Sequence, residues 1–156
     1  EQKLKEALAT VADRYDYVLI DCPPALNMLT VNALVASKSV MIPMQCEYYA
    51  LEGLSDLVET LRKVRENLNP ELEIEGLLRT MYNAQSTLTQ QVPDELTSHF
   101  GNKVYSTTIP RNARLAEAPS HGKPARAYDA SSKGAQAYGA LAEELLGRHG
   151  KSTAKK

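Results

Sequence analysis

Residues 15–24 read Tyr-Asp-Tyr-Val-Leu-Ile-Asp-Cys-Pro-Pro, and this stretch decides the fold class. Its short and nearly continuous apolar run is typical of a strand buried in a parallel sheet, and the two prolines end it. The carboxylate of Asp21 then follows the strand directly, where a hard oxygen on a rigid edge is able to hold a hydrated Mg²⁺. An Asp at a strand end is also a common turn residue, so other motifs must decide between the two interpretations.

Strands and helices alternate along the rest of the chain. We expect helices over residues 1–12, 29–36, 51–67 and 87–100, and a last helix from Ser131 or Ser132 onward. Strands are expected over residues 15–21, 39–43, 74–82 and 104–109, and a loop rich in Pro and Gly over residues 112–130. This order predicts an α/β fold in which helices flank a parallel sheet. We expect one domain over residues 1–148 and a disordered basic tail over residues 149–156.

Composition bounds the class of protein. The chain has 156 residues, of which 43% are hydrophobic and 24% charged, the ordinary balance of one globular domain. No apolar run reaches the roughly 20 residues of a membrane span, and the charged start is unlike a secretory signal, so we expect a soluble cytoplasmic protein. Cys22 and Cys46 fit no metal-ligand spacing and are expected to be reduced thiols.

The net charge of −1 conceals an asymmetry along the chain. Residues 1–100 carry 8 Lys and Arg against 15 Asp and Glu, a net charge of −7, whereas residues 101–156 carry 10 against 4, a net charge of +6. An anionic partner is therefore expected to meet the C-terminal third, although a basic surface without a partner explains the same count.

Polar residues follow each predicted strand at its C-terminal end, which is where parallel sheets bind ligands. The four segments are Asp21-Cys22-Pro23-Pro24, Pro43-Met44-Gln45-Cys46-Glu47, Thr80-Met81-Tyr82-Asn83 and Ile109-Pro110-Arg111-Asn112.

Four motifs, in order along the chain, resemble those of a known family. They are residues 15–24, Leu29-Thr-Val-Asn-Ala-Leu34, residues 42–54 (Ile-Pro-Met-Gln-Cys-Glu-Tyr-Tyr-Ala-Leu-Glu-Gly-Leu) and residues 109–124 (Ile-Pro-Arg-Asn-Ala-Arg-Leu-Ala-Glu-Ala-Pro-Ser-His-Gly-Lys-Pro). Together they resemble the ParA/Soj family of chromosome-partitioning ATPases, and the match extends from about Tyr15 to Leu146.

The resemblance implies a deviant Walker-type P-loop NTPase fold that uses ATP and Mg²⁺. It also implies a homodimer formed as an ATP sandwich, non-specific DNA binding in the ATP state, a ParB-type partner and a location on the nucleoid, where the cargo is a chromosome or a plasmid. Asp21 corresponds to the Walker B aspartate, which holds Mg²⁺ through water, and Pro23 and Pro24 lie at switch II. Contacts to the adenine side are implied for Thr80, Met81, Tyr82, Asn83, Pro110, Arg111 and Asn112.

Two departures from the family pattern limit what the chain is expected to do alone. The Lys-Gly-Gly-rich P-loop and the switch I aspartate are absent from the 156 residues, so we expect a piece of a longer protein that does not hydrolyse ATP by itself. Asn83-Ala84-Gln85 stands where relatives usually carry Asp-x-Arg, which removes one candidate phosphate contact.

The DNA surface is predicted to centre on Arg111 and Arg114, with Lys123 and Arg126 as weaker members. A short helix over residues 112–118 would let Arg111 and Arg114 reach one phosphate backbone. The alternative is that one of these arginines pairs with Glu117 or contacts nucleotide.

Two other functions stay open. A MinD-like ATPase would reach the membrane through a C-terminal amphipathic helix, but the last helix contains Glu143 and Glu144 and neither Trp nor Phe, so no membrane contact is expected. A nucleotide-free interaction module would keep the sheet without the phosphate-binding loop.

Overall fold

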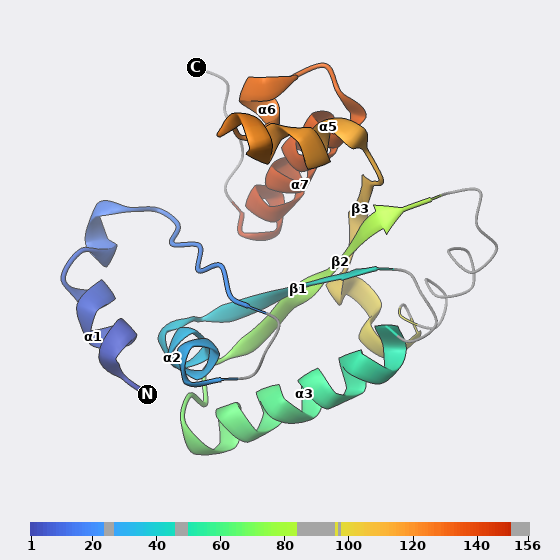
Figure 1. The fold of residues 1–156 in the computed structure, drawn as a ribbon. Helices are drawn as coiled ribbons and strands as arrows, with labels where there is room; N and C mark the ends of the chain where they lie inside the picture. Colours follow the sequence, from blue (N-terminus) through green and yellow to red (C-terminus); the bar gives the residue numbers. More distant parts are fainter. Residues whose placement is uncertain (24–26, 46–49, 84–95, 97, 151–156) are drawn as a thin grey trace. The chain divides into compact units, whose positions relative to one another are not determined.

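The computed structural model describes residues 1–23, 27–45, 50–83, 96 and 98–150 (Figure 1). The chain divides into two compact units, which are described separately. The first consists of residues 1–41 and 52–75, and the second of residues 42–51 and 76–156.

The first unit contains helices α1 (Lys3–Ala9), α2 (Met28–Ala36) and most of α3 (Ala50–Asn67). The α3 helix buries Leu54, Leu61 and Val64, which recur at helical spacing along one face. On its outer face Lys63 Nζ lies 3.7 Å from Glu59 Oε1, the i,i+4 pair that their spacing predicts. The helix boundaries predicted from sequence are therefore confirmed for α2 and α3.

A buried asparagine joins two segments of this unit. Asn69 is 6% exposed, and its side-chain Nδ2 donates hydrogen bonds to Leu34 O at 2.9 Å and Ser37 O at 2.8 Å. These carbonyls belong to the end of α2, where helical partners run out. Asn69 thus ends α3 and also fixes the exit of α2.

The strand predicted over residues 15–21 is not formed. After a short 3-10 turn (Ala12–Arg14), these residues are irregular, with Leu19 86% exposed. A strand persists only when neighbouring strands take up its backbone N–H and C=O groups. Among the described residues the sheet consists of β1, β2 and β3, and none of these pairs with residues 15–21. The apolar run therefore stays unpaired with the described strands.

Three strands form the sheet, in the order β1 (Ser39–Gln45), β2 (Glu73–Tyr82) and β3 (Val104–Pro110). The strands β2 and β3 pair in parallel, and β1 lies beside β2 (Figure 1). In the second unit, Leu77 and Tyr105 are fully buried, and Thr80 Oγ1 donates to Met44 O at 3.2 Å. The three strands that the sequence predicts for this sheet are confirmed.

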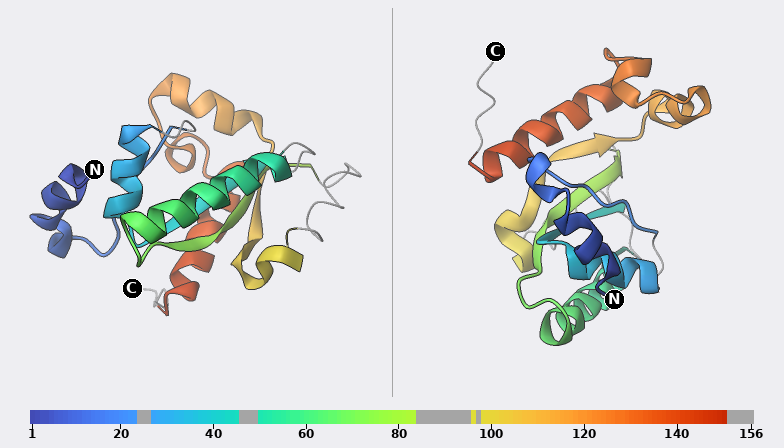
Figure 2. Two further views of the ribbon diagram at one scale, coloured as in Figure 1. Left: turned by 90° about the horizontal axis from the view of Figure 1, so that it is seen from below. Right: turned by 90° about the vertical axis from the view of Figure 1, so that its left-hand side faces the viewer.

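Helix α7 (Lys133–Arg148) packs along β3 in the second unit (Figure 2). Ser132 caps its start, since the hydroxyl accepts a hydrogen bond from Ala135 N at 3.2 Å. The buried face includes Gly134, Ala135 and Leu141, whereas Tyr138 is 47% exposed.

Residues 112–130 are not the loop that their Pro and Gly content predicts. They fold into α5 (Ala113–Glu117), a 3-10 turn (Ala118–His121) and α6 (Ala125–Tyr128). Pro119 lies in the first turn of its helix and Pro124 caps the next, positions where a missing N–H costs nothing, so proline here starts helices.

Several predictions fall on residues that the structure does not describe: Pro24, Cys46, most of the helix over residues 87–100, and residues 151–156 of the tail. Within the described part of the chain, no helix is both long and apolar enough to cross a membrane.

Candidate functional site

Asp21 lines a cavity of about 540 Å³ in the first unit. The walls come from α1, from residues 20–23 and from α2, and they are mostly apolar. The polar side chains on the wall are those of Lys3, Asp21, Cys22 and Asn32. Pro23 also lines this cavity, so two of the predicted site residues, Asp21 and Pro23, share one wall.

Cys22 follows Asp21 and is an exposed, free thiol. Burial, and then the negative charge of Asp21, raise the pKa of Cys22 above its ordinary value. Its Sγ donates to Ile20 O at 3.8 Å. Because the thiolate is the nucleophile and the metal ligand, a raised pKa lowers the fraction of the reactive form at this thiol.

Helix α2 brings an unexpected polar group to the cavity. Asn27 caps the helix, its Oδ1 accepting hydrogen bonds from Leu29 N at 2.9 Å and Thr30 N at 3.1 Å. One turn further, Asn32 lines the cavity, and its Oδ1 is buried without a hydrogen-bond partner. Sequence analysis missed this residue, although an amide in the middle of an apolar helix is a signal that could have found it.

The predicted adenine-side segments meet in the second unit. Tyr82, at the end of β2, is the register partner of Pro110, at the end of β3, and Arg111 N donates to Tyr82 O at 3.3 Å. Asn112 is not free, since its Oδ1 accepts from Arg114 N at 3.0 Å and caps α5. The C-terminal ends of two parallel strands thus present Thr80–Asn83 beside Pro110–Asn112, the arrangement that ligand-binding sheet edges use.

Backbone strain marks this edge. Met81 has φ +50°, the one non-glycine residue with positive φ among the described residues, and the β2–β3 register shifts between Arg79 and Tyr82. A side chain in the left-handed region costs about 1 kcal/mol, and such residues are frequent at binding sites. Next to Met81, the Arg79 guanidinium lies 5.6 Å from the Tyr82 ring centroid.

The predicted DNA-binding cations divide into two groups. Arg111, Lys123 and Arg126 are exposed, and no ion pair to them is found in the described part of the chain. The short helix considered over residues 112–118 is present as α5 with its caps Asn112 and Ala118, and Arg111 lies directly before it.

Arg114 is held by two carboxylates. Its Nη1 lies 2.8 Å from Glu117 Oε2, and its Nε lies 3.6 Å from Asp129 Oδ2. Tyr128 Oη also donates to Glu117 Oε2 at 3.1 Å, and hydrogen bonds from Arg114 and then Tyr128 lower the pKa of Glu117. The alternative that the sequence left open, an Arg–Glu117 pair, is the contact observed for Arg114.

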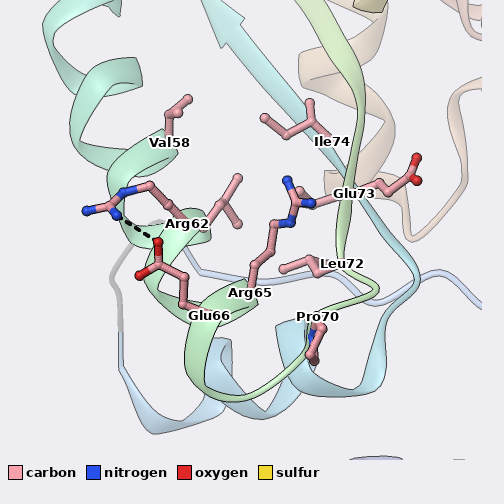
Figure 3. A pocket seen from close by; sticks show the side chains of 10 residues that line it. Val58, Arg62, Arg65, Glu66, Pro70, Leu72, Glu73 and Ile74 are labelled. Carbon is pink, nitrogen blue, oxygen red and sulfur yellow. Dashed lines mark hydrogen bonds and ion pairs between the residues drawn. The ribbon is translucent and has the colours of Figure 1, made fainter.

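A second cavity, of about 520 Å³, lies in the first unit between the end of α3 and the starts of β1 and β2 (Figure 3). Leu61 and Leu72 form its buried floor. Arg62 turns toward Glu66, to which Nη1 is bonded at 2.7 Å, while Arg65 extends toward β2. None of the residues predicted for a site lines this cavity. Among the described residues no group of three or more His, Cys, Asp and Glu side chains is placed to hold a metal.

The sequence is similar to proteins of known name over most of its length. A family model described as "AAA domain" matches residues 1–74. The sporulation initiation inhibitor protein Soj of Bacillus subtilis is 57% identical over 93% of this chain and 57% of its own length. The chromosome partitioning protein ParA of Caulobacter vibrioides is 51% identical over 94% of this chain and 55% of its own length. This chain belongs to the ParA/Soj family. It spans little more than half the length of these relatives.

Solved structures share the fold of this chain. One is a cobyrinic acid a,c-diamide synthase from Mycobacterium smegmatis with bound ATP analog and magnesium. Its TM-score is 0.77 at 36% identity, and the match covers 99% of this chain and 56% of the synthase chain. The cell division ATPase MinD of Pyrococcus furiosus gives a TM-score of 0.75 at 25% identity, and the match covers 94% of this chain and 58% of the MinD chain. The predicted fold class, a parallel sheet flanked by helices as in P-loop NTPases, is confirmed.

Proposed function

We propose that this chain supplies the Mg²⁺ side and the adenine side of the nucleotide site in a partitioning ATPase that dimerises on ATP and binds DNA non-specifically. The observation that carries the proposal is the pairing of Tyr82 with Pro110, together with the Arg111 N to Tyr82 O hydrogen bond. This pairing joins the two segments for which the family resemblance implies adenine contacts.

The residues around Asp21 fit a hydrated Mg²⁺. The ion prefers oxygen ligands and keeps several of its waters, and the cavity offers the Asp21 carboxylate. When bound, Mg²⁺ neutralises charge on the phosphates of ATP. Asp21 would hold the ion through water, and the Pro23-Pro24 pair would form the switch II segment that the family resemblance implies.

The 156 residues contain no Gly-rich loop that ends in Lys-Thr or Lys-Ser to cradle the β- and γ-phosphates. We therefore propose that the chain contributes to a nucleotide site without turning over ATP on its own. The ParB-type partner and the location on the nucleoid belong to this proposal as well.

The electrostatic support for DNA binding is the positive third of the chain. Arg111, Lys123 and Arg126 carry charges that no described carboxylate neutralises, so they are the members of this surface best able to meet phosphates. Arg114 contributes less than the sequence suggests, because Glu117 and Asp129 already neutralise it.

Salt titrations test the DNA-binding proposal on an ATP-loaded protein in which these 156 residues are joined to a phosphate-binding P-loop segment, using two labelled duplexes of different sequence. We expect equal affinity for both, and a salt slope that falls by about one in Arg111→Ala and in Arg126→Ala. Arg62→Ala is the matched control, since Glu59 and Glu66 already pair with Arg62. Slopes unchanged in both variants would refute the DNA surface. Binding to anionic vesicles without DNA binding would favour the MinD-like alternative, and binding to neither would favour the interaction module.

A further inference from the structure

Strand β3 contains a bulge over residues 105–107. Leu77 and Arg79 are two residues apart on β2. Their register partners on β3, Val104 and Thr108, are four residues apart. Because the longer path must leave the ladder between the two strands, the bulge frees backbone N–H and C=O groups, and these groups need other hydrogen-bond partners.

Arg79 serves the carbonyl groups of this bulge. Its Nη2 donates to Tyr105 O at 3.2 Å and to Ser106 O at 3.4 Å. The N–H groups of the bulge donate to the Glu144 carboxylate on α7. The Arg79 Nε is buried and has no hydrogen-bond partner in the described part of the chain. Since an unsatisfied polar group lowers stability, a contribution to stability alone does not account for Arg79.

A second bulge, on β2, brings Tyr82 next to Arg79. These two residues are three positions apart, whereas their register partners, Pro110 and Thr108, are two apart. Within this stretch Met81 has φ +50°, a conformation typical of the extra residue of a bulge. Side chains three positions apart on a regular strand point to opposite faces of the sheet. The extra residue changes this alternation and allows the observed contact, in which the Arg79 guanidinium lies 5.6 Å from the Tyr82 ring centroid.

One guanidinium thus contacts the β3 bulge and the Tyr82 ring at once. A guanidinium within about 6 Å of a ring centroid is attracted to the face of the ring. A ring that is held in one orientation binds its ligand at a lower cost in entropy. We infer that Arg79 is a positioning residue that fixes the Tyr82 ring for contact with an adenine base. This inference rests on the proposed adenine-side role of Tyr82 and extends it to the interior of β2.

Isothermal titration calorimetry tests the inference on the protein in which these 156 residues are joined to a phosphate-binding P-loop segment. The probes are ADP and pyrophosphate, each with Mg²⁺, because pyrophosphate has no base. In Arg79→Met we expect the dissociation constant for ADP to rise about fivefold, the scale of one contact between a cation and a ring, and that for pyrophosphate to stay unchanged. Arg79→Lys should raise the ADP constant about threefold, because it keeps the charge but not the planar guanidinium.

Arg148→Met is the matched control. The Arg148 Nη2 donates to Val104 O at 3.0 Å, and its guanidinium lies 3.9 Å from the ring centroid of Tyr105 rather than against Tyr82. Arg148 therefore supports the same part of β3 through a different ring. We expect Arg148→Met to bind ADP within about twofold of the parent, and the ring signals of Tyr82 in ¹H NMR spectra to shift in Arg79→Met but not in Arg148→Met.

The outcomes separate this inference from the proposal beneath it. If ADP shifts no backbone amide signal within residues 80–83 and 111–112 of the parent, the adenine-side proposal fails and the inference fails with it. If ADP shifts these signals and Arg79→Met binds ADP like the parent, the role of Arg79 is refuted and the proposal stands. Equal losses for ADP and pyrophosphate, or a loss in Arg148→Met as large as that in Arg79→Met, would show a general structural role and overturn the inference. Should Arg79→Met lose its fold by circular dichroism, Arg79→Lys decides: an ADP affinity equal to that of the parent overturns the inference.

Discussion

Glu144 is expected to stabilise the second unit through its charge. Its side chain is 19% exposed on α7, and its two carboxylate oxygens accept hydrogen bonds from Ser106 N at 2.9 Å and Thr107 N at 2.8 Å on β3. Arg148 Nη2 lies 2.9 Å from Glu144 Oε1, and its guanidinium lies 3.9 Å from the centroid of the buried Tyr105 ring. Burial alone would raise the pKa of Glu144, but the hydrogen bonds from Thr107, Ser106 and Arg148 outweigh it and lower the pKa from 4.5 to about 2.

The magnitude follows from linkage. Each pKa unit corresponds to about 1.4 kcal/mol, so the full shift is worth about 3 kcal/mol, and residual solvent screening reduces it to about 2 kcal/mol. Because the folded-state pKa is depressed, this stability is complete above the unfolded pKa of 4.5 and is lost as the pH falls through about 2. Glu144→Gln should therefore lower the free energy of unfolding by about 2 kcal/mol at pH 7, and the difference should close toward pH 2.

Urea denaturation of the 156-residue chain at pH 7, 4 and 3, followed by circular dichroism, measures this difference. Glu143→Gln is the matched control. Glu143 is next to Glu144 in the sequence and its side chain is exposed, so this change should alter the free energy of unfolding by less than about 0.5 kcal/mol. Equal stabilities for parent and Glu144→Gln at pH 7, or a difference that persists unchanged at pH 3, would refute the reasoning.

Two further substitutions probe packing, each with a control of the same kind. Asn69→Ala should lower the free energy of unfolding by about 2–3 kcal/mol, because it leaves buried carbonyls at the end of α2 unpaired. The control is Asn67→Ala. Because the Asn67 Nδ2 bonds Lys63 O at an exposed position, this substitution should lower the free energy of unfolding by less than about 1 kcal/mol. Comparable losses for the two in chemical denaturation would contradict the capping role. Gly134→Ala should lower the melting temperature, because the new Cβ would lie 2.5 Å from Leu115 Cγ. Gly139 lies on the same helix, and a Cβ added there would meet no atom within 4 Å. Gly139→Ala should therefore raise the free energy of unfolding by about 1 kcal/mol. A melting temperature for Gly134→Ala at or above that of the parent would show that Leu115 moves aside.

Much of the candidate site was predictable from the sequence because its residues directly follow strands. Tyr82 and Pro110 end apolar runs, and parallel strands bring such ends to one edge without knowledge of any side chain. The buried oxygen of Asn32 was not predicted, since only the packing around α2 leaves it without a hydrogen-bond partner. The role of Arg114 could not be settled either, because the second carboxylate that neutralises it, Asp129, follows another helix.

The sequence by itself determined the local elements and the family. Helical periodicity placed α2, α3 and α7, and short apolar runs placed β1 to β3, because these patterns act between residues close along the chain. The tertiary structure decided what depends on distant partners. Residues 15–21 have the pattern of a strand yet do not form one, because a strand needs a neighbour to take up its backbone hydrogen bonds. The Glu144 contact with β3 spans 38 residues, and only the packing of α7 against that strand desolvates the carboxylate and supplies the N–H donors that keep it charged.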